Sequence, residues 1–266
     1  MINKVLKFIN ESVWQDNTDS AYLEFATYEA FKEITRNKNK NKMLYRIAGQ
    51  AGSGKTSQIS YALSKALMSK NIEPVCVSVR FFAKYHKDYS ELLKRYGERE
   101  IREKTNGFAL KCLTLTLEKI FKSGYMILLD LTLLDPIFEQ YVYLLTQKYG
   151  YDVEYHIISA NKAISDKFIL NRQNNLLEME GGRIIYSASK KYFYNILPKS
   201  LKYLSKIDKS NICYVWNVVS EEPVAEGKLY EILDAFKQNR KIINFCLKDT
   251  EYLKFRKYKF FIHHLK

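Results

Sequence analysis

The chain has 266 residues, of which 47% are hydrophobic, and a formal net charge of +14. This composition excludes an intrinsically disordered chain, and the length allows one large α/β domain or two small ones. The lysines are spread along the sequence rather than grouped in blocks, which favours ordinary solvated surfaces over a dedicated anion-binding face.

The first half of the chain alternates between helical and strand patterns. Residues 1–37 have apolar side chains at helical spacings, with Asp19 or Ser20 as a cap within them. An apolar strand at 43–48 leads into a glycine-rich loop. The expected elements that follow are a helix at 55–69, a strand at 75–79, helices at 81–97 and 100–122, and a strand at 126–129.

The second half continues this alternation. Its expected elements are a helix at 135–148, a strand at 151–159, helices at 161–178 and 187–206, a strand at 212–218 and a helix at 225–239. Such alternation predicts an α/β fold with a mostly parallel sheet and helices on both faces. We expect an N-terminal helical segment (1–42), a P-loop kinase domain (43–240) and a basic aromatic tail (241–266). The tail pattern fits a docked amphipathic helix or a nucleic-acid-binding arm.

The cysteines indicate a reducing compartment. None of the four, at positions 76, 112, 213 and 246, forms a CxxC pair, and Cys76 and Cys213 lie in apolar strand-like runs. We interpret them as reduced core residues rather than a disulfide framework or a zinc site. The N-terminus does not resemble a signal peptide, and no apolar stretch approaches the roughly 20 residues that span a bilayer. A soluble, cytoplasmic protein is expected.

One motif carries chemistry. The run Gly49-Gln50-Ala51-Gly52-Ser53-Gly54-Lys55-Thr56, followed by Ser57, matches GxxxxGK[ST] between a strand and a helix. Glycines let successive backbone N–H groups approach phosphate oxygens, and the helix N-terminus adds its positive dipole end. Lys55 then reaches the β- and γ-phosphates and the Thr56 hydroxyl binds Mg²⁺. The sequence therefore predicts an ATP or GTP site at residues 49–57.

Two classes of P-loop protein fit poorly. A GTPase needs a guanine-reading NKxD, whereas Asn161-Lys162-Ala163-Ile164 lacks the Asp. A motor ATPase usually has two adjacent carboxylates after its third strand, whereas this strand ends in Asp130 alone. A lone Asp suits a metal contact in a kinase, although it could also cap a turn. Thr56 and Asp130 are therefore the predicted metal-binding residues.

The motif and its surroundings resemble the zeta toxins, kinases of bacterial toxin–antitoxin systems. The likeness extends from the P-loop to the segments 82–86 and 91–96, to the strand at 124–132, and to Arg172 and Arg183. It implies phosphoryl transfer from ATP with Mg²⁺, an antitoxin protein as partner, and UDP-N-acetylglucosamine as the usual acceptor, phosphorylated at a sugar 3′-hydroxyl. It also implies that Lys55, Asp130, Arg172 and Arg183 are catalytic. The arginines would neutralise the γ-phosphate, Arg183 from a lid after Gly181-Gly182.

The acceptor side departs from the family pattern. Ser78 and Arg80 stand where the family has acidic residues, the second of which is the catalytic base. Thr114 and Leu134 stand where it has acceptor contacts. Asp130, His86 and Asp88 are candidate substitute bases.

Three functions follow from these observations. The first is an ATP-dependent kinase of a small hydroxyl-bearing metabolite, such as a nucleotide sugar. The second is an ATP-binding module that no longer turns over and acts through protein partners. The third, a nucleic-acid binder, rests on the charge and the aromatic-basic tail, which is too short and too apolar to decide the matter.

Overall fold

The computed structural model describes residues 18–131, 136–177, 187–218, 220, 222–241, 261–262 and 265; the side chains of residues 98, 99, 102, 171–177 and 187–193 are excepted. Its strands are β1 (Met43–Gly49), β2 (Val75–Val77), β3 (Ile127–Asp130), β4 (Asp152–Ser159), β5 (Ile212–Asn217) and β6 (Ala225–Lys228). Its helices are α2 (Ser20–Ile34), η2 (Lys55–Ser60), α3 (Tyr61–Met68), α4 (Val79–Ala83), α5 (Tyr89–Lys122), α6 (Pro136–Tyr149), α7 (Lys162–Leu177), α8 (Ser187–Ile207) and α9 (Leu233–Asn239).

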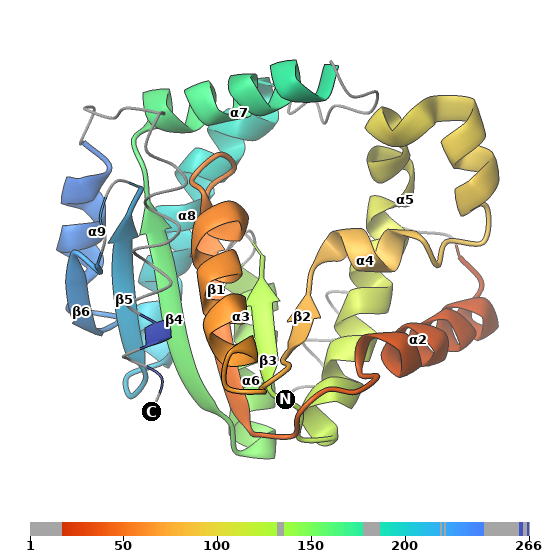
Figure 1. The fold of residues 1–266 in the computed structure, drawn as a ribbon, viewed down its shortest axis with the longest axis horizontal. Coiled ribbons are helices and arrows are strands. Elements are labelled where there is room, and N and C mark those ends of the chain that lie inside the picture. The colour runs from red at the N-terminus through yellow and green to blue at the C-terminus, as the bar shows by residue number, and fades with distance from the viewer. Residues whose placement is uncertain are drawn as a thin grey trace.

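The strands form one sheet in the order β2-β3-β1-β4-β5-β6 (Figure 1). The first five strands are parallel, and β6 pairs antiparallel with β5. Chain connections leave the central strand β1 in both directions, because β2 lies beyond β3 and β4 lies on the other side. In open α/β sheets this reversal creates a crevice at the carboxyl ends of the strands, where ligands bind.

Helices cover both faces of the sheet. On one face α2, α5, α6, α8 and α9 pack against alternate strand residues such as Leu44, Ile127 and Ile157. On the other face α3 packs against the intervening residues, among them Tyr45 and Leu128 (Figure 1). The predicted α/β fold, with a mostly parallel sheet covered on both faces, is confirmed.

Local signals placed several helix ends correctly. The Asp19 carboxylate accepts hydrogen bonds from the backbone N–H groups of Ala21 (2.9 Å) and Tyr22 (3.1 Å), so Asp19 is the N-cap of α2. The helical pattern of α5 is interrupted at Gly97, whose φ is 69° and ψ is 173°. Residues 1–17, which complete the expected N-terminal segment, lie outside the described residues, and the domain boundaries stay a prediction.

Four expectations were wrong in detail. The expected helix at 81–97 is divided, because α4 ends at Ala83 and α5 begins only at Tyr89. The segment 225–239 is not one helix, because its first four residues form β6 along the edge of β5. The second strand ends at Val77, and Val79 already belongs to α4. Cys76 is exposed rather than buried, since β2 is an edge strand. Cys112 and Cys213 are buried, and burial raises the pKa of the Cys112 thiol to about 11, which makes it a poor nucleophile at neutral pH.

The described part of the tail packs onto the sheet. Phe261 is fully buried, with its ring centroid 5.4 Å from that of Trp216 and 5.2 Å from that of His156. The His156 Nδ1 accepts a hydrogen bond from the Trp216 indole N–H (3.0 Å), so the cluster is also tied by a polar contact. Within the described residues, no helix is long and apolar enough to cross a membrane.

Candidate nucleotide-binding site

The glycine-rich loop lies where β1 ends, at the carboxyl edge of the sheet. Gly49 is the last residue of β1, and η2 begins at Lys55 after Gly54. Strand β3 runs parallel to β1 on one side, and its last residue, Asp130, lies opposite Ile47. The loop, the start of a helix and a carboxylate therefore meet at the switch point of the sheet.

Two glycines of the loop have backbone conformations that other residues rarely adopt. Gly52 has φ +75° and Gly54 has φ +83°. A Cβ on Gly52 would lie 2.3 Å from the backbone oxygen of Ser165 in α7, so the loop and α7 touch through bare backbone. These conformations turn successive N–H groups to one side, which is the arrangement that binds anions.

We predict that Gly52→Ala destabilises the loop and abolishes nucleotide binding. The new methyl group would collide with a backbone oxygen in addition to occupying a left-handed conformation, which alone costs about 1–2 kcal/mol. The matched control is Gly124→Ala, because Gly124 has φ +76° but open space around its Cβ position. Thermal unfolding and nucleotide titration of both variants separate the collision from the strain. Equal behaviour of the two variants would contradict this prediction.

The loop is also joined to α7 by a side chain. The amide of Gln50 donates hydrogen bonds to the Ala160 carbonyl (2.7 Å) and the Ser165 hydroxyl (2.8 Å), and Gln50 is 1% exposed. The Ser53 hydroxyl is equally buried, and neither it nor the Gln50 Oε1 has a hydrogen-bond partner within the described part of the chain. Buried polar atoms without partners are costly unless a ligand satisfies them, and of these two the Ser53 hydroxyl can donate a hydrogen bond to a phosphate oxygen.

Asp130 faces the helix that follows the loop. Its Oδ2 accepts a hydrogen bond from the Ser60 hydroxyl at the end of η2 (2.8 Å), whereas its Oδ1 is buried without a partner among the described residues. The hydroxyl of Thr56, one turn earlier, belongs to an exposed residue. Oδ1 of Asp130 and the Thr56 hydroxyl are oxygen donors of the kind that Mg²⁺ takes, commonly few from the protein together with nucleotide phosphates.

No group of three or more His, Cys, Asp or Glu residues capable of holding a metal occurs among the described residues. An all-protein metal cage is therefore not what this part of the chain offers. A nucleotide-borne Mg²⁺ contacted by Thr56 and Asp130 fits the donors that are present. Both residues stay predicted ligands.

Comparison with known proteins shows the family. The zeta toxin family model matches residues 27–230, which is more than half of the chain. The chain belongs to the zeta toxin family.

Solved structures agree on the fold. The toxin–antitoxin system PezAT of Streptococcus pneumoniae contains a chain with 19% identity and a TM-score of 0.68; the match covers 94% of this chain and 98% of that one. Two complexes of AvrRxo1-ORF1 with AvrRxo1-ORF2 also match. The one with sulphate ions has 12% identity, a TM-score of 0.54 and coverage of 96% and 84% of the two chains. The one with ATP has 15% identity, a TM-score of 0.55 and coverage of 90% and 83%. No curated protein matches significantly in sequence.

Two of the four positions that the sequence resemblance assigns to the acceptor side, Ser78 and Arg80, follow β2 at the carboxyl edge of the sheet. Ser78 directly follows β2, whose Val77 pairs with Leu129 of β3, and the exposed Arg80 is the second residue of α4. A positively charged residue therefore follows β2 at a position where the resemblance implies a carboxylate. Leu134 lies outside the described residues.

Thr114 and the candidate bases His86 and Asp88 have structural contacts instead. Thr114 is fully buried in α5, and its hydroxyl donates to the Leu110 carbonyl (2.7 Å), so it faces the core. His86 packs edge-on against the buried Phe108, and its Nδ1 accepts a hydrogen bond from the backbone N–H of Asp88 (3.2 Å). The adjoining Tyr85 carbonyl is bonded to Tyr22 of α2. His86 and Asp88 thus belong to a turn packed on α2, which leaves Asp130 as the carboxylate joined to the P-loop helix.

The two predicted arginines cannot be placed. Arg172 belongs to α7, whose backbone is described, but its side chain is not, and Arg183 with the expected lid lies outside the described residues. Their catalytic role stays a prediction. The contacts of α7 with Gln50 and Gly52 nevertheless fix the start of the helix that carries Arg172 against the P-loop.

A buried ion pair beneath this edge of the sheet was not predicted from the sequence. Arg46 of β1 and Glu139 of α6 are 0% and 1% exposed, with 2.6 Å between Nη2 and Oε1. A signal was present, since a charged residue inside an apolar strand requires a buried partner.

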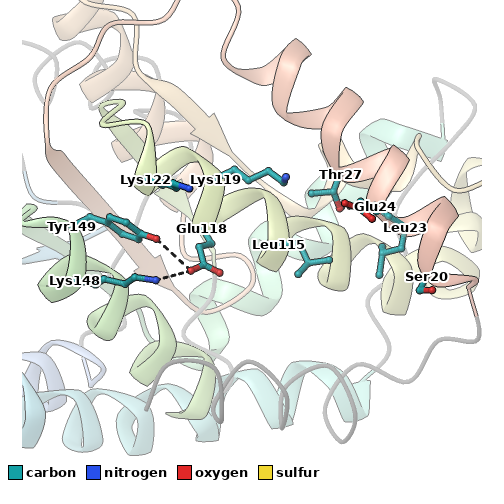
Figure 2. Close-up of a pocket in the computed structure, with 10 residues that line it drawn as sticks. All are labelled: Ser20, Leu23, Glu24, Thr27, Leu115, Glu118, Lys119, Lys122, Lys148 and Tyr149. Atoms are coloured by element: carbon teal, nitrogen blue, oxygen red, sulfur yellow. Dashed lines mark hydrogen bonds and ion pairs between the residues drawn. The ribbon is translucent and has the colours of Figure 1, made fainter.

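A groove of about 770 Å³ lies elsewhere, among α2, α5 and α6 (Figure 2). Leu23 and Leu115 are among its lining residues, and Glu118, also in the lining, bonds Lys148 (3.1 Å) and Tyr149 (3.4 Å). None of its lining residues belongs to the P-loop or to a strand end. The groove is therefore separate from the candidate nucleotide site.

Proposed function

We propose that this zeta toxin family member is a kinase that transfers the γ-phosphate of ATP, or of GTP, to a hydroxyl group of a small metabolite. The proposal is carried by two buried oxygens that have no partner among the described residues, the Ser53 hydroxyl in the loop of left-handed glycines and Oδ1 of Asp130 at the end of β3. Phosphates and their Mg²⁺ are ligands that these oxygens would bind.

The proposed reaction assigns a role to each residue. The backbone N–H groups of residues 49–57 and the ammonium group of Lys55 would hold the β- and γ-phosphates. Bound Mg²⁺ would neutralise charge on the phosphate oxygens. Thr56 and Asp130 would hold that ion, while Arg172 and Arg183 would neutralise the γ-phosphate. The acceptor oxygen attacks the γ-phosphorus as the bond to the β–γ bridging oxygen breaks, and the hydroxyl proton passes to a base or to water.

The acceptor is proposed to belong to the nucleotide sugars, as in the family, although UDP-N-acetylglucosamine itself is expected to be a poor substrate. The family base is replaced by Arg80, and Thr114, at a family contact position, is buried in α5. A lost polar contact leaves groups unpaired and can cost orders of magnitude in discrimination. Arg80 instead favours an anionic acceptor group near α4.

We predict weak or no transfer to UDP-N-acetylglucosamine with labelled ATP, while ATP binding remains intact. Arg80→Asp should raise that transfer by about tenfold or more, because a positioned base contributes 10²–10⁴-fold. Arg80→Asn is the control that removes the charge without adding a base. Efficient transfer by the native protein would contradict this account of the acceptor site.

Arg80 also favours one alternative function, an ATP-binding module without catalytic turnover. With a cation in place of the family base, the chain could bind ATP without turnover and act through protein partners. An antitoxin is the proposed partner in either case, since the PezAT neighbour belongs to a toxin–antitoxin system. Absence of phosphoryl transfer to any acceptor, together with ATP binding, would favour this binding module over the kinase.

A further inference from the structure

Arg46 lies inside the sheet, three residues before the P-loop begins. It is on the central strand β1 and is fully buried, among the largest such side chains of the described residues. Its side chain points to the face covered by α6, because the neighbouring Tyr45 and Ile47 belong to the opposite core. A guanidinium group remains charged at neutral pH, so its burial requires partners for its N–H groups.

Glu139 in the first turn of α6 supplies the charge partner. The Arg46 Nε donates to Oε2 (3.2 Å) and Nη2 donates to Oε1 (2.6 Å), which is the two-point geometry of a strong arginine–carboxylate pair. This pair ties the start of α6 to the middle of the sheet.

The third nitrogen of the guanidinium contacts backbone oxygens. Nη1 donates to the carbonyls of Ile47 (2.8 Å), Leu129 (3.2 Å) and Leu131 (2.7 Å). The first belongs to the strand that continues into the P-loop, and the other two belong to β3 and the residue after Asp130. The ladder between β1 and β3 has its last pair at Ile47 and Asp130, so Arg46 bridges the two strands where their pairing ends.

The carbonyls of Leu129, in β3, and of Leu131, directly after β3, belong to the two sequence neighbours of Asp130. Because successive side chains of a strand point to opposite faces, fixing the peptide units around Asp130 directs its carboxylate away from Arg46 and toward Ser60 of η2. Arg46 thus contacts the backbone on both sides of the carboxylate without touching the carboxylate itself.

Stability alone is a weak reason for this arrangement. Removing two charges from water costs several kcal/mol per ion, and well-packed apolar residues often replace a buried ion pair without loss of stability. What apolar residues could not provide is a donor for three carbonyls at a fixed separation.

We propose that Arg46, held by Glu139, is a positioning residue that fixes the Asp130 carboxylate relative to the P-loop for contact with nucleotide-bound Mg²⁺. The inference rests on the proposed nucleotide site, and it adds a residue pair to which neither the P-loop motif nor the resemblance assigned a role.

The test measures the binding of a non-hydrolysable ATP analogue by calorimetry, with EDTA and with Mg²⁺. The proteins are the wild type, Arg46→Lys, the double variant Arg46→Met/Glu139→Leu, and each of these with Asp130→Asn. Arg46→Lys keeps the positive charge but removes the forked guanidinium group, so it provides a second test if the double variant Arg46→Met/Glu139→Leu folds poorly. Tyr155→Phe is the control, because it removes an equally buried hydrogen bond on the same face, to Asp208 (2.8 Å), from the β4 residue that pairs with Arg46, on the side of β1 opposite β3 and Asp130.

We expect binding without Mg²⁺ to stay within about threefold of wild type in all variants. The tightening, which is the factor by which Mg²⁺ raises the affinity for the analogue, should fall by about tenfold or more in both Arg46 variants, as it does for residues that orient metal ligands. It should stay unchanged in Tyr155→Phe. Adding either Arg46 variant to Asp130→Asn should change the remaining tightening by less than about twofold, because without the carboxylate Arg46 has nothing left to position.

Several outcomes would overturn the inference. The first is an unchanged effect of Mg²⁺ on affinity in both Arg46 variants, and the second is an equal loss of that effect in Tyr155→Phe. The third is a loss from the Arg46 change that multiplies with the loss from Asp130→Asn. The fourth is failure of both Arg46 variants to fold, which would make the ion pair a folding element. Failure of the proposed function appears differently. Wild-type protein that binds the analogue with Mg²⁺ but transfers no phosphate removes the kinase and leaves the positioning role intact, whereas wild-type protein that does not bind removes both.

Discussion

Lys55→Ala is expected to lower phosphoryl transfer by about a hundredfold to a thousandfold, the usual cost of removing one group that stabilises developing charge. Lys55 is the first residue of η2, directly after the left-handed Gly54, where P-loop lysines reach the β- and γ-phosphates. The residue is only half-buried, so the fold should survive its truncation. Steady-state transfer from labelled ATP, together with thermal unfolding, measures both effects.

The control for this prediction lies on the next helix. Lys65 of α3 is exposed and stacks over the Tyr61 ring at 5.8 Å, so Lys65→Ala removes an equal charge away from the loop. It should retain turnover. If Lys55→Ala kept full activity and unchanged nucleotide affinity, the glycine-rich loop would not be a phosphate site.

Asp130→Asn should lower turnover by a comparable factor of about 10²–10⁴, because a neutral amide is a weak Mg²⁺ ligand and a poor base. The substitution keeps the size of the side chain, and its amide oxygen can still accept the hydrogen bond from Ser60, so the local structure should persist. The required Mg²⁺ concentration should rise, while binding of metal-free ATP should change little. Turnover as a function of Mg²⁺ concentration separates these effects.

Asp152→Asn is the corresponding control, since Asp152 is the exposed first residue of β4 at the opposite end of the sheet. It should behave as wild type. Wild-type turnover and Mg²⁺ dependence in Asp130→Asn would mean that this carboxylate is only a strand-end residue bonded to Ser60.

Long periodic elements could be predicted from the sequence because their signals are local. The apolar strands β1, β3, β4 and β5 and the breaks at Gly97 and Gly124 follow directly from residue pattern. Strand β6 could not, because Ala225–Lys228 has little strand propensity and is extended only through its pairing with β5. The exposure of Cys76 depends on strand order, which places β2 at an edge and which no local pattern encodes.

The candidate site likewise has a part that could be predicted from the sequence and a part that could not. The phosphate loop is contiguous in the chain, so its motif suffices to locate it. The contacts of Asp130 with Ser60, of Gln50 with Ser165 and of Arg46 with Glu139 join residues 70, 115 and 93 positions apart, and only the folded chain brings them together. The alignment with the family placed Thr114 near the acceptor, yet its side chain faces the core, because helix rotation is not fixed by alignment alone.

The helix α7 connects the two halves of the proposed machinery. Its start is bonded to Gln50 and packed on Gly52, and its later residues include Arg172. A ligand that orders the P-loop would therefore act on the helix that carries a predicted γ-phosphate contact.

Incubation of the purified protein with ATP labelled at the γ-phosphate, Mg²⁺ and a small-molecule cell extract tests the central claim most directly. The account predicts that label moves from ATP to a phosphorylated metabolite, and that Lys55→Ala lowers this transfer by about a hundredfold or more while Lys65→Ala does not. Retention of all label in ATP, or its release only as inorganic phosphate with every extract fraction, would contradict a kinase of small molecules.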